Sequence, residues 1–150
     1  MLIKPKKSLG QNFLHDENII NKIINASKIS SDDQVLEVGP GTGNLTKLII
    51  SQKPKKIYVV EKDKSLAAEL ENQYYNKINV INKDILKITN EFYSGKKFLI
   101  LGNLPYNIST KILTNLLTPK SGKGKWEILF LMFQLEVANR IVAMPNTKQY

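Results

Sequence analysis

Short apolar runs alternate with amphipathic segments along most of this 150-residue chain, and no other feature restricts its fold as strongly. The pattern predicts strands at 35–39, 56–61, 79–84, 98–102 and 127–133. It predicts helices at 44–52, 65–75, 109–117 and 135–143, and the polar stretch before Gly95 has room for a short helix. Five successive strand and helix repeats favour an α/β fold, in which helices cover both faces of a parallel sheet. The continuous apolar run at 98–102 is typical of a strand buried on both faces.

A helix is also expected before the first strand. Asp16 is placed to cap it, and its apolar stripe consists of Ile19, Ile20, Ile23 and Ile24. The residues before this helix are basic. We therefore expect an N-terminal arm at 1–15, followed by one domain at 16–150.

The composition is strongly basic, since 22 Lys and Arg against 13 Asp and Glu give a formal net charge of +9. Such a surface attracts phosphates at long range, which favours a polyanionic partner. Lysines that only keep the protein soluble explain the same composition, so charge alone leaves both interpretations open.

Several functional classes are excluded by what the sequence lacks. Without cysteine there are no disulfides, thiolate metal sites or cysteine nucleophiles. The only histidine, His15, has no metal-binding constellation around it, so no metal is expected. The N-terminus lacks the apolar region of a signal peptide, and no apolar run approaches the ~20 residues of a membrane span. We expect a cytoplasmic protein with no membrane partner.

Glycines follow the first predicted strand, where parallel sheets bind their ligands. In EVGPGTGN at 37–44, Gly39, Gly41 and Gly43 occupy the turn into the next helix, and their missing side chains let a ligand approach backbone N–H groups. The spacing differs from the G-x-G-x-x-G of dinucleotide-binding proteins. A purely structural tight turn remains the alternative.

Carboxylates end the next two predicted strands. Glu61 lies roughly 22 residues after Gly39, the separation at which an acid accepts hydrogen bonds from ribose hydroxyls. Asp84 is placed to accept from an adenine amino group, although either acid could instead cap the helix that follows it. Because the first turn has no P-loop lysine, a triphosphate is disfavoured and S-adenosylmethionine fits better.

The fourth predicted strand ends in Asn103, Leu104, Pro105 and Tyr106. The amide oxygen of Asn103 and a backbone carbonyl near Leu104 or Pro105 can accept both N–H bonds of an adenine amine, which turns the nitrogen lone pair toward a methyl group. Tyr106 can stack on the flipped base, and Pro105 restricts the backbone. The alternative is an ordinary turn in which Asn103 bonds the backbone and Tyr106 packs.

Six segments together resemble the small-subunit ribosomal RNA adenine N6-dimethyltransferases: KSLGQNFL at 7–14, EVGPGTGNLT at 37–46, Glu61, Asp84, NLPYNIST at 103–110 and FQLEVANRIVA at 133–143. The resemblance implies a Rossmann-like class I methyltransferase fold. It implies transfer of two methyl groups from S-adenosylmethionine to each of two adjacent adenosines in the 3′-terminal hairpin of small-subunit RNA, during ribosome biogenesis on the immature small subunit. It also implies cofactor contacts at Asn12, Leu14, Gly39, Glu61, Asp84 and Asn103.

The basic arm gains a role from this resemblance. Lys4, Lys6 and Lys7 are expected to contact RNA phosphates, while Gln11, Asn12 and Phe13 close over the cofactor as a lid. A disordered tail is the alternative. The loop at 120–125 either faces RNA as well or is simply solvated.

The sequence departs from the family where it ends, at PNTKQY. Relatives continue into further strands of the sheet and a helical C-terminal domain, so we expect an exposed edge strand, self-association and weak or absent RNA methylation by this chain alone. Three other functions stay open: an RNA-binding assembly factor with little catalysis, an adenine methyltransferase of large-subunit RNA, and a methyltransferase acting on DNA adenine or protein glutamine.

Overall fold

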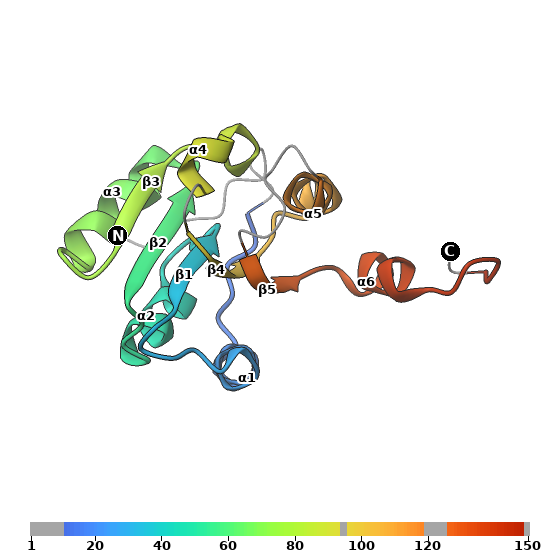
Figure 1. Cartoon of the computed structure of the whole chain (residues 1–150), viewed down its shortest axis with the longest axis horizontal. Coiled ribbons are helices and arrows are strands. Elements are labelled where there is room, and N and C mark those ends of the chain that lie inside the picture. The colour runs from blue at the N-terminus through green and yellow to red at the C-terminus, as the bar shows by residue number, and fades with distance from the viewer. Residues whose placement is uncertain (1–10, 94–95, 119–125, 149–150) are drawn as a thin grey trace.

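The computed structural model describes residues 11–93, 96–118 and 126–148 (Figure 1). Five parallel strands form one sheet in the order β3-β2-β1-β4-β5. They are β1 (Gln34–Val38), β2 (Lys56–Glu61), β3 (Asn79–Asn82), β4 (Phe98–Asn103) and β5 (Trp126–Met132). All five predicted strands are confirmed. The strand predicted at 79–84 ends earlier, because Asp84 caps a 3-10 turn, η2 (Ile85–Lys87).

The helices agree closely with the sequence pattern. They are α1 (Glu17–Ser27), α2 (Asn44–Ser51), α3 (Lys64–Gln73), α4 (Asn90–Tyr93), α5 (Ser109–Leu117) and α6 (Leu135–Val142). Asp16 caps α1 as predicted, accepting from the N–H of Asn18 and Ile19. The predicted stripe of α1 is too wide: Ile20 and Ile24 are buried against α2 and the adjoining sheet, but Ile19 is exposed.

Two apolar layers hold the helices to the sheet. On one face, α1 and α2 pack on alternate residues of the strands, among them Val35, Val59 and Leu101. On the other face, η2, α4 and α5 cover Leu36, Val60, Ile100 and their neighbours. This confirms a parallel sheet with helices on both faces, and five successive residues of β4, Phe98 to Gly102, are buried.

The strand order reverses between β1 and β4, so the helices that follow them, α2 and α5, lie on opposite faces of the sheet, and such folds bind ligands in the crevice between the two connections. The two strands are in register, with Val38 opposite Gly102. A Cβ at Gly102 would lie 2.8 Å from the carbonyl oxygen of Val38, so no other residue fits there. The close approach brings the turn after β1 next to Asn103, the last residue of β4.

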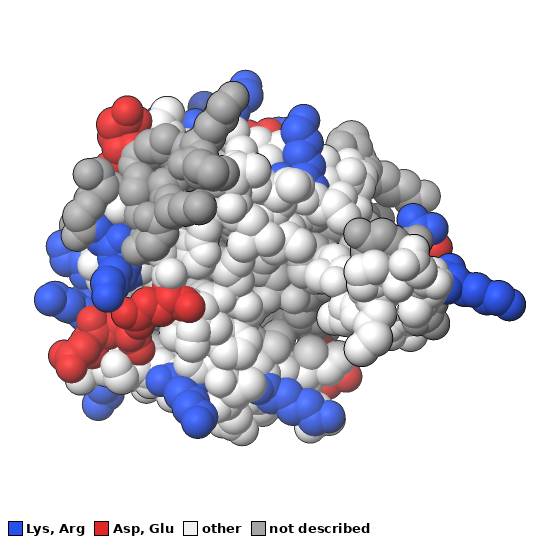
Figure 2. Space-filling model, turned by 45° about the vertical axis from the view of Figure 1, so that its right-hand side comes forward, with Lys and Arg blue, Asp and Glu red and all other residues white. Residues whose placement is uncertain are grey.

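Beyond α5 the described part of the chain is more exposed. Helix α6 has no buried residue, and it extends away from the sheet in Figure 1. Exposed apolar side chains gather on β5, α6 and the residues after it, including Ile128, Leu135, Val142 and Met144. Figure 2, in which this side comes forward, shows charged side chains mainly around the margin. Within the described residues, no helix has the length and apolarity to cross a membrane.

Candidate active site

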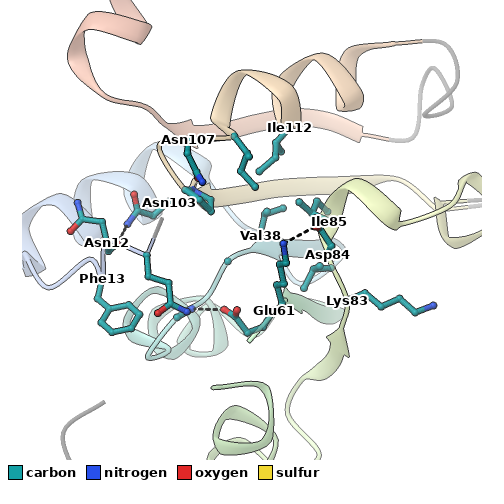
Figure 3. A pocket seen from close by; sticks show the side chains of 17 residues that line it. Asn12, Phe13, Val38, Glu61, Lys83, Asp84, Ile85, Asn103, Asn107 and Ile112 are labelled. Atoms are coloured by element: carbon teal, nitrogen blue, oxygen red, sulfur yellow. Dashed lines mark hydrogen bonds and ion pairs between the residues drawn. The ribbon is translucent and has the colours of Figure 1, made fainter. Parts of the chain in front are cut away.

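A cavity lies at the carboxyl ends of β1, β2 and β4, and Gln11, Asn12 and Phe13 form one of its sides (Figure 3). Seven of the predicted site residues line it: Asn12, Gly39, Gly41, Glu61, Asp84, Asn103 and Pro105. The other four described ones, Leu14, Gly43, Leu104 and Tyr106, lie beside it. Lys4, Lys6, Lys7 and the loop at 120–125 fall outside the described residues.

The glycine turn after β1 combines a ligand-facing part with a packed part. Gly41 has a φ of +58°, and a Cβ there would lie 3.0 Å from the Phe13 ring, so the bare backbone fits beneath this side chain. Gly43 has a φ of +82°, and a Cβ there would lie 2.9 Å from Leu70 of α3. Gly43 therefore fits the interpretation as a purely structural tight turn. Gly39 and Gly41 instead line the cavity, where a ligand could approach their backbone.

Glu61 is buried at the end of β2 and is hydrogen-bonded to the glycine turn. Its carboxylate accepts hydrogen bonds from the N–H of Gly41 (3.2 Å) and of Asp63 (2.8 Å). Burial raises the pKa of Glu61, and the hydrogen bonds from Asp63 and Gly41 oppose this. The backbone N–H of Lys62 contributes as well, and a carboxylate has about four acceptor positions, so the group can still accept from a ligand hydroxyl.

Asp84 caps η2 and forms an ion pair with a lysine. Oδ1 accepts from the N–H of Leu86 (3.0 Å), and Oδ2 lies 3.1 Å from Lys62 Nζ. Partial burial raises the pKa of Asp84, but the bond from Leu86 and the charges of Lys62 and Lys87 outweigh it, so the pKa lies below its usual value. Asp84 therefore caps the helical turn that follows it, which is the alternative that the sequence left open. Its carboxylate also lines the cavity.

The four residues from Asn103 to Tyr106 divide into buried and accessible parts. Leu104 is buried in the core beneath α5, whereas Tyr106 is 41% exposed. The carbonyl of Pro105 accepts the N–H of Ile108 (3.2 Å), which leaves the Leu104 carbonyl as the freer backbone acceptor. Asn103 Nδ2 donates to the carbonyl of Asn12 (2.7 Å), so its amide oxygen faces away from that segment.

The segment from Gln11 to Leu14 is fixed to three parts of the molecule. Gln11 donates to Asp63 after β2, and the carbonyl of Leu14 accepts from Asn44 Nδ2 (2.7 Å) at the start of α2. The side-chain amide of Asn12 donates to the hydroxyl of Tyr106. These contacts lay the segment along one side of the cavity, where the sequence predicts a lid.

Sequence reasoning missed the apolar walls and several polar side chains of this cavity. The apolar residues are Val38, Val60, Ile85, Ile108 and Ile112, and the polar ones are Lys62, Lys83 and Asn107. Lys62 and Lys83 directly adjoin Glu61 and Asp84, so their place beside the strand ends is the signal that could have found them. Across the described ranges, no group of three His, Asp or Glu residues is arranged to hold a metal ion.

Sequence relatives identify the family to which this site belongs. The chain matches the family "Ribosomal RNA adenine dimethylase" over residues 3–150. It is 47% identical to "Ribosomal RNA small subunit methyltransferase A" of Pelagibacter ubique, covering all of this chain and 57% of that protein. The protein of that name from Chlorobium limicola is 48% identical, with 99% of this chain and 55% of that protein covered. The chain thus spans about half the length of the curated relatives it matches.

Solved structures agree on the fold. A dimethyladenosine transferase from Plasmodium falciparum is 31% identical with a TM-score of 0.76, over 93% of this chain and 49% of that one. The 23S rRNA methyltransferase ErmE is 29% identical with a TM-score of 0.72, over 86% of this chain and 50% of that one. The predicted Rossmann-like methyltransferase fold and the resemblance seen in the motifs are both confirmed. The chain belongs to the ribosomal RNA adenine dimethylase family.

Proposed function

We propose that this site binds S-adenosylmethionine and dimethylates N6 of adenosines in small-subunit ribosomal RNA. The observation that carries the proposal is the orientation of Asn103. Its amide nitrogen is occupied by the Asn12 carbonyl, and its oxygen remains as an acceptor beside a cavity with two carboxylates, Glu61 and Asp84. An adenine amine is a poor nucleophile, and a hydrogen-bond acceptor beside the nucleoside pocket can accept one of its N–H bonds and so favour attack by its lone pair.

The residues that line the cavity suit the chemistry of the proposed cofactor. Glu61 offers carboxylate lone pairs to ribose hydroxyls, and Asp84 offers one to an adenine amine. Val38, Val60 and Ile85 supply apolar walls for a base. When bound, S-adenosylmethionine supplies an electrophilic methyl group on a sulfonium. Gly39 and Gly41, without side chains, leave backbone accessible on the other side.

The acceptor side requires no strong general base. The Asn103 oxygen and the Leu104 carbonyl would accept the two N–H bonds of an adenine amine and favour a pyramidal nitrogen, whose lone pair would then be directed at the methyl group that S-adenosylmethionine would supply. The methylated nitrogen would carry a positive charge and readily release one of its protons to water. Tyr106 is placed to stack on the flipped base.

RNA of the small subunit is the favoured substrate because the relatives of 47% and 48% identity are named for it, whereas the large-subunit enzyme ErmE is 29% identical. The net charge of +9 suits a phosphate-rich partner. As parts of the same proposal, two adjacent adenosines of the 3′-terminal hairpin on the immature subunit are the targets. Lys4, Lys6 and Lys7 contact RNA phosphates, and the protein acts in the cytoplasm.

Methyl transfer from labelled cofactor to immature small subunits tests this function. Because the chain spans about half of its relatives' length, the assay uses a chimera in which residues 1–150 replace the matched segment of the Pelagibacter ubique relative. We expect transfer by the chimera, a loss of about 100-fold or more with Asn103→Ala, and no change with Asn72→Ala on the exposed face of α3. Tight RNA binding without transfer would instead indicate an assembly factor.

A further inference from the structure

We infer that Asn12 positions the methyl acceptor: its backbone carbonyl orients the Asn103 amide, and its side chain holds the Tyr106 ring. This inference rests on the proposed function and assigns Asn12 to the target base. The resemblance implies instead a contact between Asn12 and the cofactor. The two assignments predict different kinetic effects of the same substitution.

The first contact fixes which end of the Asn103 side chain faces Asn12 and which end stays available as an acceptor. A carbonyl oxygen can only accept, so the 2.7 Å contact with Asn12 must be made by Nδ2 of Asn103. A rotation of the amide by 180° would place two oxygens against each other. The amide oxygen therefore points away from the Asn12 carbonyl, and no donor among the described residues contacts it. Figure 3 shows Asn12 and Asn103 facing one another beside the cavity that both residues line.

The second contact restrains the partly exposed aromatic ring of Tyr106. Tyr106 is 41% exposed, and its hydroxyl accepts from Asn12 Nδ2. Its backbone is held separately, since the Tyr106 carbonyl accepts from Ser109 Oγ (3.3 Å). Loss of the hydroxyl contact would free the ring to change rotamer without unfolding the turn, so a base stacked on it would be held less firmly.

Asn12 can serve as a fixed point because both of its neighbours are anchored on the cofactor side of the cavity. Gln11 contacts Asp63, and the Phe13 ring lies over Gly41. One residue later, Leu14 accepts from Asn44. Within the described residues, the hydrogen bonds of Asn12 go to the opposite side, to Asn103 and Tyr106, which are 91 and 94 positions away in the sequence. The segment thus connects the two halves of the site.

A double-mutant cycle separates positioning from cofactor binding. We expect Asn12→Ala and Tyr106→Phe each to lower the single-turnover rate of methyl transfer by about three- to tenfold, the effect of one hydrogen bond. The double variant should be no slower than the slower single variant, and the S-adenosylmethionine Kd should change less than about twofold. Asn72→Ala is the matched control, an exposed asparagine on α3. A large rise in Kd with an unchanged rate, or rate losses that multiply, would overturn the inference.

NMR of the side-chain amide of Asn103 tests the backbone contact in the 150-residue chain without any need for activity. We expect two resolved, exchange-protected proton signals that survive deletion of residues 1–10 and also Asn12→Ala, which keeps the carbonyl. Deletion of residues 1–12 should abolish the protection. If that deletion leaves the signals unchanged, the carbonyl does not orient Asn103 and the inference fails. Absence of methyl transfer by the wild type would refute the proposed function alone, because the NMR result stands independently.

Discussion

Replacing Glu37 by glutamine should change how the stability of this protein depends on pH. Glu37 lies in β1 directly before the glycine turn and is 1% exposed. Its carboxylate accepts from Thr46 Oγ1 of α2 at 2.6 Å. Burial raises the pKa of Glu37 from 4.5 to about 7; the Thr46 bond opposes this shift, and the nearby Glu61 adds to it.

The sign and size of the effect follow from this pKa. Between about pH 4.5 and 7 the unfolded chain has released a proton that the folded chain still holds, so the free energy of unfolding falls as pH rises. A difference of about 2.5 pKa units corresponds to roughly 3 kcal/mol. This contribution is fully present below about pH 4.5 and is lost as pH rises through about 7. Glutamine has nearly the same shape and cannot ionise, so the variant should lack this slope.

Urea unfolding at several pH values, followed by the fluorescence of Trp126, measures the slope. Between about pH 4.5 and 8 the wild type should lose roughly 3 kcal/mol more than Glu37→Gln. The control is Glu71→Gln on the exposed side of α3, which should keep the wild-type slope. Comparing slopes removes any constant cost of burying the new amide. A constant difference between wild type and Glu37→Gln across this pH range would refute the reasoning.

Three further predictions concern other parts of the molecule. Gly43→Ala should lower the free energy of unfolding by about 1 to 3 kcal/mol in urea titrations, because the residue has a φ of +82° and its Cβ would lie 2.9 Å from Leu70; an unchanged midpoint contradicts this packing. Glu61→Ala should raise the Kd for S-adenosylmethionine, measured by calorimetry, about 10- to 100-fold, because a charged hydrogen-bond acceptor is lost. An unchanged Kd would show that Glu61 does not bind the cofactor. Exposed Leu135 and Val142 should make the chain self-associate, and their joint replacement by lysine should lower the sedimentation coefficient; identical sedimentation of both proteins would show that this surface is not responsible.

The sequence predicts most of the fold because each element carries its own local signal. The alternation of apolar runs with helical stripes locates all five strands, and the uninterrupted run from Phe98 marks a strand buried on both faces. The assignment of Ile19 to the apolar stripe is wrong because burial also depends on neighbouring elements. How much of a helix is covered depends on how many neighbours it meets, which the pattern of one segment does not contain.

The site is predictable only where strand ends carry distinctive residues. Glu61 and Asn103 end β2 and β4, Asp84 follows β3, and all three line the same cavity. Asn107 carries no such signal, since asparagine abounds on surfaces, and Lys62 and Lys83 could be found only from their place beside Glu61 and Asp84. The contacts of Asn12 with Asn103 and Tyr106 join residues 91 and 94 positions apart, and only the folded chain shows them.

Identifying the methylated nucleoside tests the central claim most directly. Small-subunit RNA is digested after incubation with the chimera and S-adenosylmethionine, and the nucleosides are separated by mass spectrometry. N6,N6-dimethyladenosine should be found in the 3′-terminal hairpin with the wild-type sequence and should be absent with Asn103→Ala. A chimera that binds the cofactor but leaves adenine N6 unmodified, or that methylates DNA or protein instead, would contradict the account.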